Sequence, residues 1–300
     1  MTRLIVNVGS ISLDTTRTPF KTVTEILGGS GTFFSIASSF FDETGLVGVV
    51  GSDFPEKYLK LLGDRINLAG LKVEKGKTFR FDSSFGYDLG VRTTNKTELN
   101  VFGKWSPLVP DEYRGAEYLY LGNVSPRQQL DVLDQMNHPK LTIADTIEFW
   151  IKNNREELIE VISRVDGVVL NYEEVRQLCE TPNIFIGART IMDWGADLVV
   201  VKKGEHGSIL FNGDTIFPTC GFPLEKITDP TGAGDCFAGG LMGHIARSGR
   251  PDNAILKEAV VYGNVMGSFA VEEFGVDRFL SLSLVDIERR YSIYKTMVTF

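Results

Sequence analysis

The stretch "DPTGAGDCFAGG", residues 229–240, sets Asp235 directly after a Gly-Ala-Gly turn and directly before an apolar segment. Glycine is costly inside a helix, so the turn predicts a helix start at which backbone N–H groups converge without side chains in the way. Those N–H groups and the helix dipole favour a bound anion. A bound anion would repel an aspartate at this place, so its presence favours a chemical role. One such role is to take a proton from a hydroxyl that attacks phosphorus. The alternative is that Asp235 only caps the helix.

Composition limits the class of protein. The chain has 300 residues, of which 43% are hydrophobic and 23% charged, with a net charge of −8. These values predict a globular protein with a large core, and they argue against nucleic acid as a partner. The absence of a long apolar run and of a signal peptide predicts no membrane association. Three scattered cysteines and three scattered histidines predict a reduced, cytoplasmic protein without a structural metal.

Short apolar segments alternate with amphipathic ones along most of the chain. This alternation predicts an α/β fold with a mostly parallel central sheet and helices on both faces, whose ligands gather at the carboxyl ends of the strands. No linker or internal repeat interrupts it, so we expect one domain over residues 1–300. The expected strands are 3–11, 45–53, 118–123, 140–145, 167–171 and 197–204, and the expected helices are 55–66, 126–136, 156–165 and 183–195.

Residues 77–102 break this rhythm, because polar and apolar residues alternate there between turn signals. The pattern predicts a small antiparallel sheet inserted into the α/β body. It is either a surface hairpin extension or, together with part of 11–25, a lid over a ligand cleft. The aromatic residues that favour the lid are Phe79, Phe81, Phe85 and Tyr87.

Three common motifs fail. "GLKVEKGKT" has five residues between Gly70 and Gly76, where a phosphate-binding P-loop needs four. The dinucleotide fingerprint fails because Phe34 and Phe237 stand where its third glycine belongs, which counts against a nicotinamide oxidoreductase. "GGSGT" has Thr32 in place of the last glycine of a nucleophile elbow.

Residues 229–237 resemble the C-terminal signature of the PfkB family of ribokinase-like carbohydrate kinases, in which an aspartate precedes Gly-Ala-Gly-Asp. The resemblance covers nearly the whole chain. "VNVGSISLD" (6–14) is similar to the family's first strand and sugar-contacting aspartate, and "LGGSGTFFSIASSFF" (27–41) to its glycine pair. "NYEEV" (171–175) matches its Asn-x-x-Glu motif, and "VVVKKGEHGSILF" (199–211) its nucleotide turn. The family implies a ribokinase-like fold with a β lid.

The resemblance implies roles for individual residues. Asp235 is the expected catalytic base, and Gly232, Ala233 and Gly234 form the expected anion hole. Asn171 and Glu174 are expected to organise Mg²⁺ through water, although the same pair also fits a helix capping box.

Further positions follow from the same resemblance. The expected ATP contacts are Lys202, Gly204, Gly207 and Asn264. In many family members the positions of Asp229 and Thr231 bind a monovalent cation such as K⁺. The expected acceptor contacts are Asp14, Gly28, Gly29, Phe33 and Asn123.

Two departures bear on the acceptor. Phe33 stands where the family usually has an asparagine, and Lys202 replaces a frequent threonine and offers a direct phosphate contact. We therefore expect an ATP-dependent kinase that phosphorylates a primary hydroxyl of a sugar. Phe33 and the lid aromatics favour a nucleoside as the alternative acceptor. A non-catalytic protein that binds a nucleotide or sugar is the more distant alternative. The sequence leaves undecided whether two copies form a homodimer through the lid.

Overall fold

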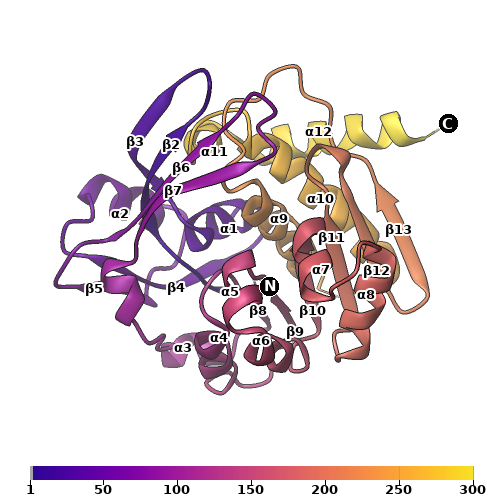
Figure 1. The fold of residues 1–300 in the computed structure, drawn as a ribbon, viewed down its shortest axis with the longest axis horizontal. Helices are drawn as coiled ribbons and strands as arrows, with labels where there is room; N and C mark the ends of the chain where they lie inside the picture. The colour runs from indigo at the N-terminus through magenta and orange to yellow at the C-terminus, as the bar shows by residue number, and fades with distance from the viewer. Residues whose placement is uncertain (1–2, 250, 300) are drawn as a thin grey trace.

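The computed structural model describes residues 3–249 and 251–299, and a nine-stranded sheet runs through it (Figure 1). The strand order is β13-β12-β11-β10-β9-β8-β1-β4-β5. The seven neighbouring strands β5, β4, β1, β8, β9, β10 and β11 run parallel. Strands β12 and β13 extend the sheet with antiparallel pairing. The mostly parallel sheet is therefore confirmed. Its strands are β1 (Ile5–Val8), β4 (Thr44–Gly51), β5 (Leu71–Glu74), β8 (Tyr118–Leu121), β9 (Leu141–Ala144), β10 (Gly167–Asn171), β11 (Leu198–Lys202), β12 (Ser208–Asn212) and β13 (Thr215–Thr219).

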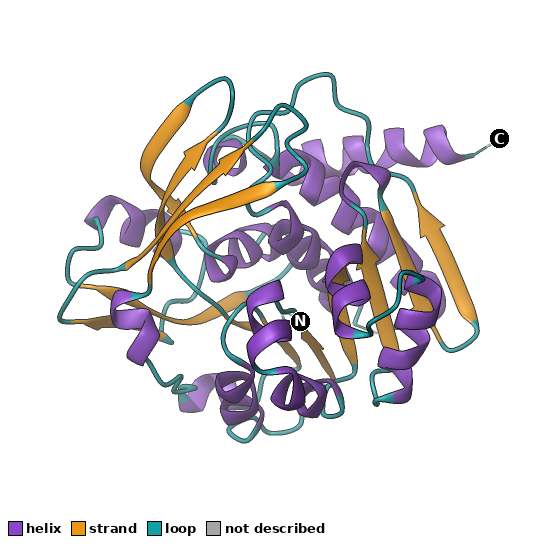
Figure 2. Cartoon of the chain, viewed as in Figure 1, coloured by secondary structure: helices purple, strands orange, loops and turns teal. Residues whose placement is uncertain are grey.

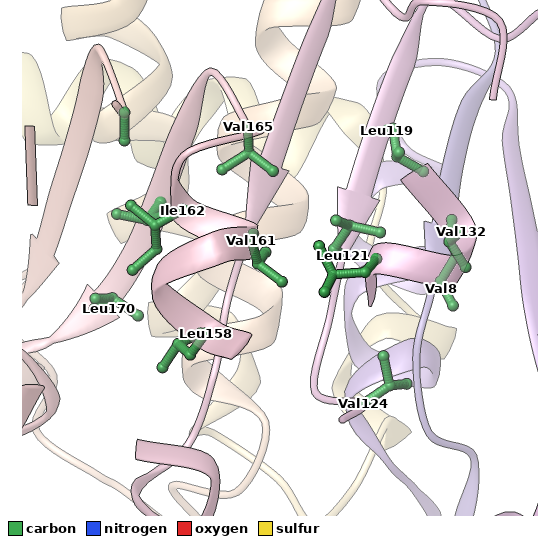
Figure 3. Close-up of a cluster of buried hydrophobic side chains, with 14 of the residues drawn as sticks. Val8, Leu119, Leu121, Val124, Val132, Leu158, Val161, Ile162, Val165 and Leu170 are labelled. Atoms are coloured by element: carbon green, nitrogen blue, oxygen red, sulfur yellow. The ribbon is translucent and has the colours of Figure 1, made fainter. Parts of the chain in front are cut away.

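Helices cover both faces of this sheet because alternate strand residues point to opposite sides. Ile5 and Tyr120 pack with side chains of α1 (Ser30–Ser38), α9 (Ala233–Ser248) and α10 (Asn253–Ala270). Val8 and Leu121 join the opposite cluster, which also contains Val132 and Leu158 (Figure 3). The helices on that second side are α4 (Pro126–Leu133), α5 (Glu148–Asn153), α6 (Arg155–Ile162), α7 (Tyr172–Leu178) and α8 (Ile184–Asp193).

The remaining elements are short or peripheral. They are α2 (Glu56–Gly63), η1 (Asn100–Lys104), α3 (Asp111–Arg114), η2 (Gly204–His206), α11 (Asp277–Leu280) and α12 (Leu284–Val298). Within residues 3–249 and 251–299, no helix has both the length and the apolar character needed to cross a membrane.

A second sheet of four strands, in the order β3-β2-β6-β7, stands above one end of the first (Figure 2). It differs from the expected antiparallel sheet because β2 pairs parallel with β6. Along the chain β2 follows β1 and β6 follows β5. Because β1 and β5 run parallel in the main sheet, β2 and β6 leave that sheet in the same direction. The strands are β2 (Ser12–Arg17), β3 (Thr22–Gly28), β6 (Phe79–Phe85) and β7 (Arg92–Glu98).

Polar residues collect where the parallel strands end. Lys202 and Asn171 end β11 and β10 and are register partners, while Asp145 directly follows β9. Because parallel strands end at the same edge of a sheet, these side chains are brought to the edge at which α/β folds bind ligands.

Candidate active site

The turn formed by residues 232–234, here called the anion turn, begins helix α9. Gly232 is the N-cap residue, with a left-handed φ of 77°, and its carbonyl accepts from the Cys236 N–H at 2.9 Å. A Cβ at this position would lie 2.4 Å from the Phe33 ring. Only glycine therefore fits both the backbone conformation and the space. The first turn of a helix leaves N–H groups without intrahelical partners, so this turn can receive an anion.

Asp235 lies in the first turn of α9, next to these N–H groups. Burial, followed by the charge of Asp145, raises the pKa of Asp235 to about 7, against the lowering effect of Lys202 and Arg92. A carboxyl group with a pKa near the working pH can accept a proton and release it again. The position thus combines an anion site with a proton acceptor.

Lys202 faces the anion turn from the end of β11. Its Nζ lies 3.1 Å from the place that a Cβ of Gly234 would occupy. The same Nζ donates to Asp145 Oδ2 at 3.0 Å. Burial by itself lowers the pKa of Lys202, but the charges of Asp145 and Glu174 outweigh burial and raise the pKa overall. Lys202 is therefore a permanent cation beside the anion turn.

Asn171 and Glu174 form the capping box of α7. The Glu174 N–H donates to Asn171 Oδ1 at 2.9 Å, and the Asn171 N–H donates to a Glu174 carboxylate oxygen at 2.7 Å. Burial, then the charge of Asp145, raises the pKa of Glu174 to about 8. Among the residues that the structure describes, no three side chains of the metal-binding types are grouped to hold a metal ion. Any metal here would have to be completed by water and phosphate oxygens.

Asp14 lies opposite the anion turn, on β2. Burial, partly opposed by Ser12, raises the pKa of Asp14 to about 7, and the charges of Asp229 and Asp235 add to the increase. A Cβ at Gly28 would lie 2.0 Å from Asp14 Oδ2, so the carboxylate occupies the space that this glycine leaves. Gly29 has a φ of 96° and passes close to the Ser10 carbonyl. Asp14 and Asp235, distant in sequence, are thus near enough for the charge of Asp235 to raise the pKa of Asp14.

Asp229 and Thr231 form a small polar site just before the anion turn. The Thr231 N–H donates to Asp229 Oδ1 at 2.9 Å. Within the described part of the chain, Asp229 Oδ2 and Thr231 Oγ1 are buried without a hydrogen-bond partner. Burial raises the pKa of Asp229, against the hydrogen bond from the Thr231 N–H. Two buried oxygens without donors suit a cation.

The expected nucleotide residues lie in the hairpin after β11 and on α10. Gly204 has a φ of 58° and open space around it, whereas Gly207, with a φ of 84°, lies tight against the Thr219 carbonyl. Asn264 Nδ2 donates to Thr219 Oγ1 at 2.9 Å and to Ser208 Oγ at 3.2 Å. Asn264 therefore ties α10 to the hairpin as well as lying beside the expected nucleotide site.

A family model described as pfkB family carbohydrate kinase matches residues 1–281. The chain belongs to the PfkB family. This confirms the resemblance drawn from residues 229–237, and this PfkB chain is an ATP-dependent phosphotransferase.

Known proteins agree with that assignment. A cytidine kinase of Thermococcus kodakarensis (strain ATCC BAA-918 / JCM 12380 / KOD1) is 31% identical over 265 residues, covering 86% of this chain and 92% of the relative. A putative ribokinase II from E. coli, solved with ATP and Mg²⁺, has a TM-score of 0.80 at 19% identity, over 98% of this chain and 100% of that one. A fructokinase double mutant from Vibrio cholerae O395, solved with fructose, ADP and potassium, has the same TM-score and identity, over 97% and 99%. The two structures show the ribokinase-like fold.

The PfkB site differs from the sequence-based expectation at Phe33. This residue was expected to contact the acceptor, but it is only 2% exposed and its ring lies under Gly232. Every residue of α1 is buried, so Phe33 supports the anion turn and presents no face to an acceptor. Asn123 lies past the end of β8, where its Oδ1 accepts from Trp150 Nε1 at 3.1 Å.

The lid aromatics also separate into different environments. Phe79 stacks on Phe102 with ring centroids 5.3 Å apart, which anchors β6 to the core. Tyr87 is 85% exposed. Phe81 carries the Arg92 guanidinium over its ring at 5.1 Å. Phe79 and Phe81 lie near each other, with ring centroids 6.5 Å apart, but Tyr87 does not join them in one wall over a cleft.

Sequence reasoning missed Asp145 in the candidate site of this PfkB chain. Its Oδ2 accepts from Lys202 Nζ and from the Tyr120 hydroxyl, the latter at 3.1 Å, and its charge acts on Asp235 and Glu174. Its position directly after the buried segment "KLTIA" was a usable signal, because acidic residues at the carboxyl end of a parallel strand lie at the ligand edge.

Proposed function

We propose that this chain transfers the γ-phosphoryl group of ATP to a primary hydroxyl of a sugar or nucleoside. The observation that carries the proposal is Asp235, a carboxyl group with its pKa raised to about 7 in the first turn of α9. Asp14, on β2, is near enough for its pKa to be raised by the charge of Asp235. A base between an anion site and a second carboxylate suits the deprotonation of a hydroxyl that attacks phosphorus.

In this proposal each residue of the site has a distinct role. Asp14 accepts hydrogen bonds from acceptor hydroxyls and orients the CH₂OH group toward Asp235. As the acceptor oxygen bonds to the γ-phosphorus, its proton passes to Asp235, and the bond between that phosphorus and the β–γ bridging oxygen breaks to release ADP. The N–H groups of the anion turn and the Lys202 ammonium group stabilise charge on the moving phosphoryl group. Gly204, Gly207 and Asn264 would border the rest of ATP.

Mg²⁺ fits the proposal through the capping-box pair. When bound, Mg²⁺ neutralises charge on the β- and γ-phosphate oxygens. Glu174 is buried, and one of its carboxylate oxygens already accepts from the Asn171 N–H. The pair would therefore hold the ion through its water shell.

An acceptor screen tests the proposed function. With ATP and Mg²⁺ present, we expect cytidine, adenosine, ribose, fructose and myo-inositol to include at least one acceptor that raises ADP release about a hundredfold over the rate without acceptor. Equal amounts of ADP and phosphorylated acceptor, measured by coupled assay and mass spectrometry, complete the test. ATP binding without release of ADP with any acceptor would instead support the non-catalytic alternative.

We also propose that a monovalent cation binds at Asp229 and Thr231. Their two buried oxygens without donors have the chemistry that K⁺ accepts. We expect turnover to fall several-fold when tetramethylammonium chloride replaces KCl at equal ionic strength, because the cation no longer stabilises the loop before the anion turn. Asp229→Asn should lose this dependence on K⁺. Equal rates in both salts would contradict the cation site.

The proposal also covers the cellular location of the enzyme, its lid and its oligomeric state. We place it in the cytoplasm, where ATP is available and where its free cysteines stay reduced. We propose that the second sheet acts as a lid over the acceptor. Its edge strands β3 and β7 are where a second copy could pair in a homodimer, which light scattering would detect.

A further inference from the structure

Asp145, at the ligand edge of the main sheet, is a buried acidic residue that the proposed reaction does not use. It directly follows β9 and is 6% exposed. Burying a charged side chain is unfavourable unless hydrogen bonds and an opposite charge compensate for it. The groups that surround the Asp145 carboxylate therefore indicate its role.

The protein holds this carboxylate firmly from the side of the sheet. Oδ1 accepts from the Thr146 N–H at 2.7 Å, and Oδ2 accepts from the Tyr120 hydroxyl at 3.1 Å. Tyr120 is itself 0% exposed and stacks on Phe34 with ring centroids 4.1 Å apart. Gln129 Nε2 donates to the Asp145 carbonyl at 2.9 Å and so holds the backbone too. The carboxylate therefore has one well-defined position.

From this position Asp145 sets the direction of the Lys202 side chain. Lys202 ends β11, and β10 lies between β11 and β9 in the sheet. Neighbouring strands are about 4.8 Å apart, so the lysine side chain crosses the end of β10 to reach Asp145. Its Nζ donates to Oδ2 at 3.0 Å. Within residues 3–249 and 251–299, Asp145 is the only acidic side chain that forms an ion pair with Lys202.

The same extended side chain brings the Lys202 ammonium group to the anion turn. Its Nζ lies 3.1 Å from the place that a Cβ of Gly234 would occupy. An ammonium group has three N–H donors, and Asp145 takes one of them, so the others are available to phosphate oxygens. The charges of Asp145 and Lys202 also act on Asp235, the first raising its pKa and the second lowering it. The three charged groups are thus close enough to influence one another.

We propose that Asp145 is a positioning residue for phosphoryl transfer, an inference that rests on the proposed function. Asp145 touches neither ATP nor the acceptor. It holds the Lys202 ammonium group beside the anion turn, where this group meets the γ-phosphate oxygens. A charge that is already in place stabilises the transition state without rearrangement during the reaction. A lysine side chain without this anchor is flexible and would pair equally well with the other phosphate groups of ATP.

Asp145→Asn tests the positioning role, because its expected effects on kcat and on KM differ. We expect kcat to fall about tenfold, since the ammonium group is no longer fixed. The KM for ATP should stay the same or decrease, because a negative charge near the phosphates has been removed. Asp134→Asn is the matched control. Asp134 pairs with Arg164 at 2.6 Å, before the start of β10 and so at the opposite edge of the sheet, and its loss should change neither value.

A double-mutant cycle tests whether Asp145 acts through Lys202. Lys202→Met should lower kcat about a hundredfold and raise the KM for ATP several-fold, because a phosphate contact is lost. When Asp145→Asn is added to Lys202→Met, kcat should change by no more than about twofold, since no ammonium group is left to position. If the two single losses multiply in the double variant, Asp145 acts independently of Lys202 and the proposal is wrong.

Tyr120→Phe tests the same arrangement without removing a charge. It deletes the hydroxyl that helps to fix Asp145 Oδ2 and keeps the ring that stacks on Phe34. We expect kcat to fall several-fold at an unchanged KM for ATP, with a melting temperature close to that of the wild type. In the Lys202→Met background the same substitution should leave kcat unchanged.

Other outcomes would also overturn the assignment. An unchanged kcat in Asp145→Asn would show that Lys202 needs no anchor, while the kinase proposal would stand on the turnover of the wild type. A higher KM for ATP and a lower melting temperature without a loss of kcat would give Asp145 a role in folding only. Absence of ADP release with every acceptor would refute the proposed function itself, and the role of Asp145 with it.

Discussion

Asp235→Asn should lower turnover by about two to four orders of magnitude, the usual scale for losing a positioned base. The amide has nearly the same shape but cannot take the acceptor proton. Affinity for ATP should stay equal or improve, because a carboxylate next to the anion turn repels phosphate. Steady-state kinetics and calorimetric titration with ATP measure the two effects. A variant that keeps a tenth of wild-type turnover would reduce Asp235 to a helix cap.

The pH profile of the wild-type enzyme is the companion measurement. The pKa of Asp235 is raised to about 7, so the base is lost by protonation as the pH falls through this value. We expect kcat/KM for the acceptor to decrease below about pH 7 and to level off above it. Asp14, whose pKa is also raised to about 7, titrates in the same range and steepens the fall. A flat profile between pH 6 and pH 8 would contradict the assignment of the base.

Gly232→Ala should abolish most turnover, by at least about a hundredfold, since displaced groups in an anion site typically cost that much. The added Cβ would sit 2.4 Å from the Phe33 ring on a backbone with a φ of 77°. The turn can accept it only by moving the N–H groups that face the phosphoryl group. Turnover and the affinity for acceptor should be measured together, and the affinity should change much less.

Gly213→Ala is the matched control for Gly232→Ala. Gly213 also has a left-handed φ, 53°, but nothing lies near its added Cβ. This variant meets the same backbone penalty of about 1–2 kcal/mol without the clash, so it should lose some stability and keep its turnover. If both variants lost activity equally, backbone strain alone would explain the result and the anion turn would have no special role.

The sequence predicted the main sheet and its helices because their signals are local. Buried strands such as Leu198–Lys202 and helices such as Pro126–Leu133 each carry their own apolar pattern and end signals. The parallel pairing of β2 with β6 was not visible in this way, because it joins residues 12–17 to residues 79–84. Pairing between distant segments depends on the direction in which each segment leaves the main sheet.

The site was predictable where a motif fixed the spacing and not where three-dimensional neighbours decided the role. Asp235 and Gly232 stand in one short motif. Asp145 meets Lys202 only through the adjacency of strands distant in sequence. Phe33 was expected to contact the acceptor, yet its ring is buried under Gly232. Only packing could reveal that change of role.

The second sheet has a consequence for how this enzyme can diversify. Its strands come from two excursions of the chain, residues 12–28 and 79–98, while Asp235, Lys202 and the anion turn belong to α9 and to the main sheet. Substitutions on β6 and β7 can therefore accumulate without displacing the groups that we propose to move the phosphoryl group. Asp14 is the exception, because it lies in the second sheet and its pKa still responds to the charge of Asp235. In a duplicated copy of this gene, a new substrate could be acquired on β6 and β7 while the reaction is inherited unchanged.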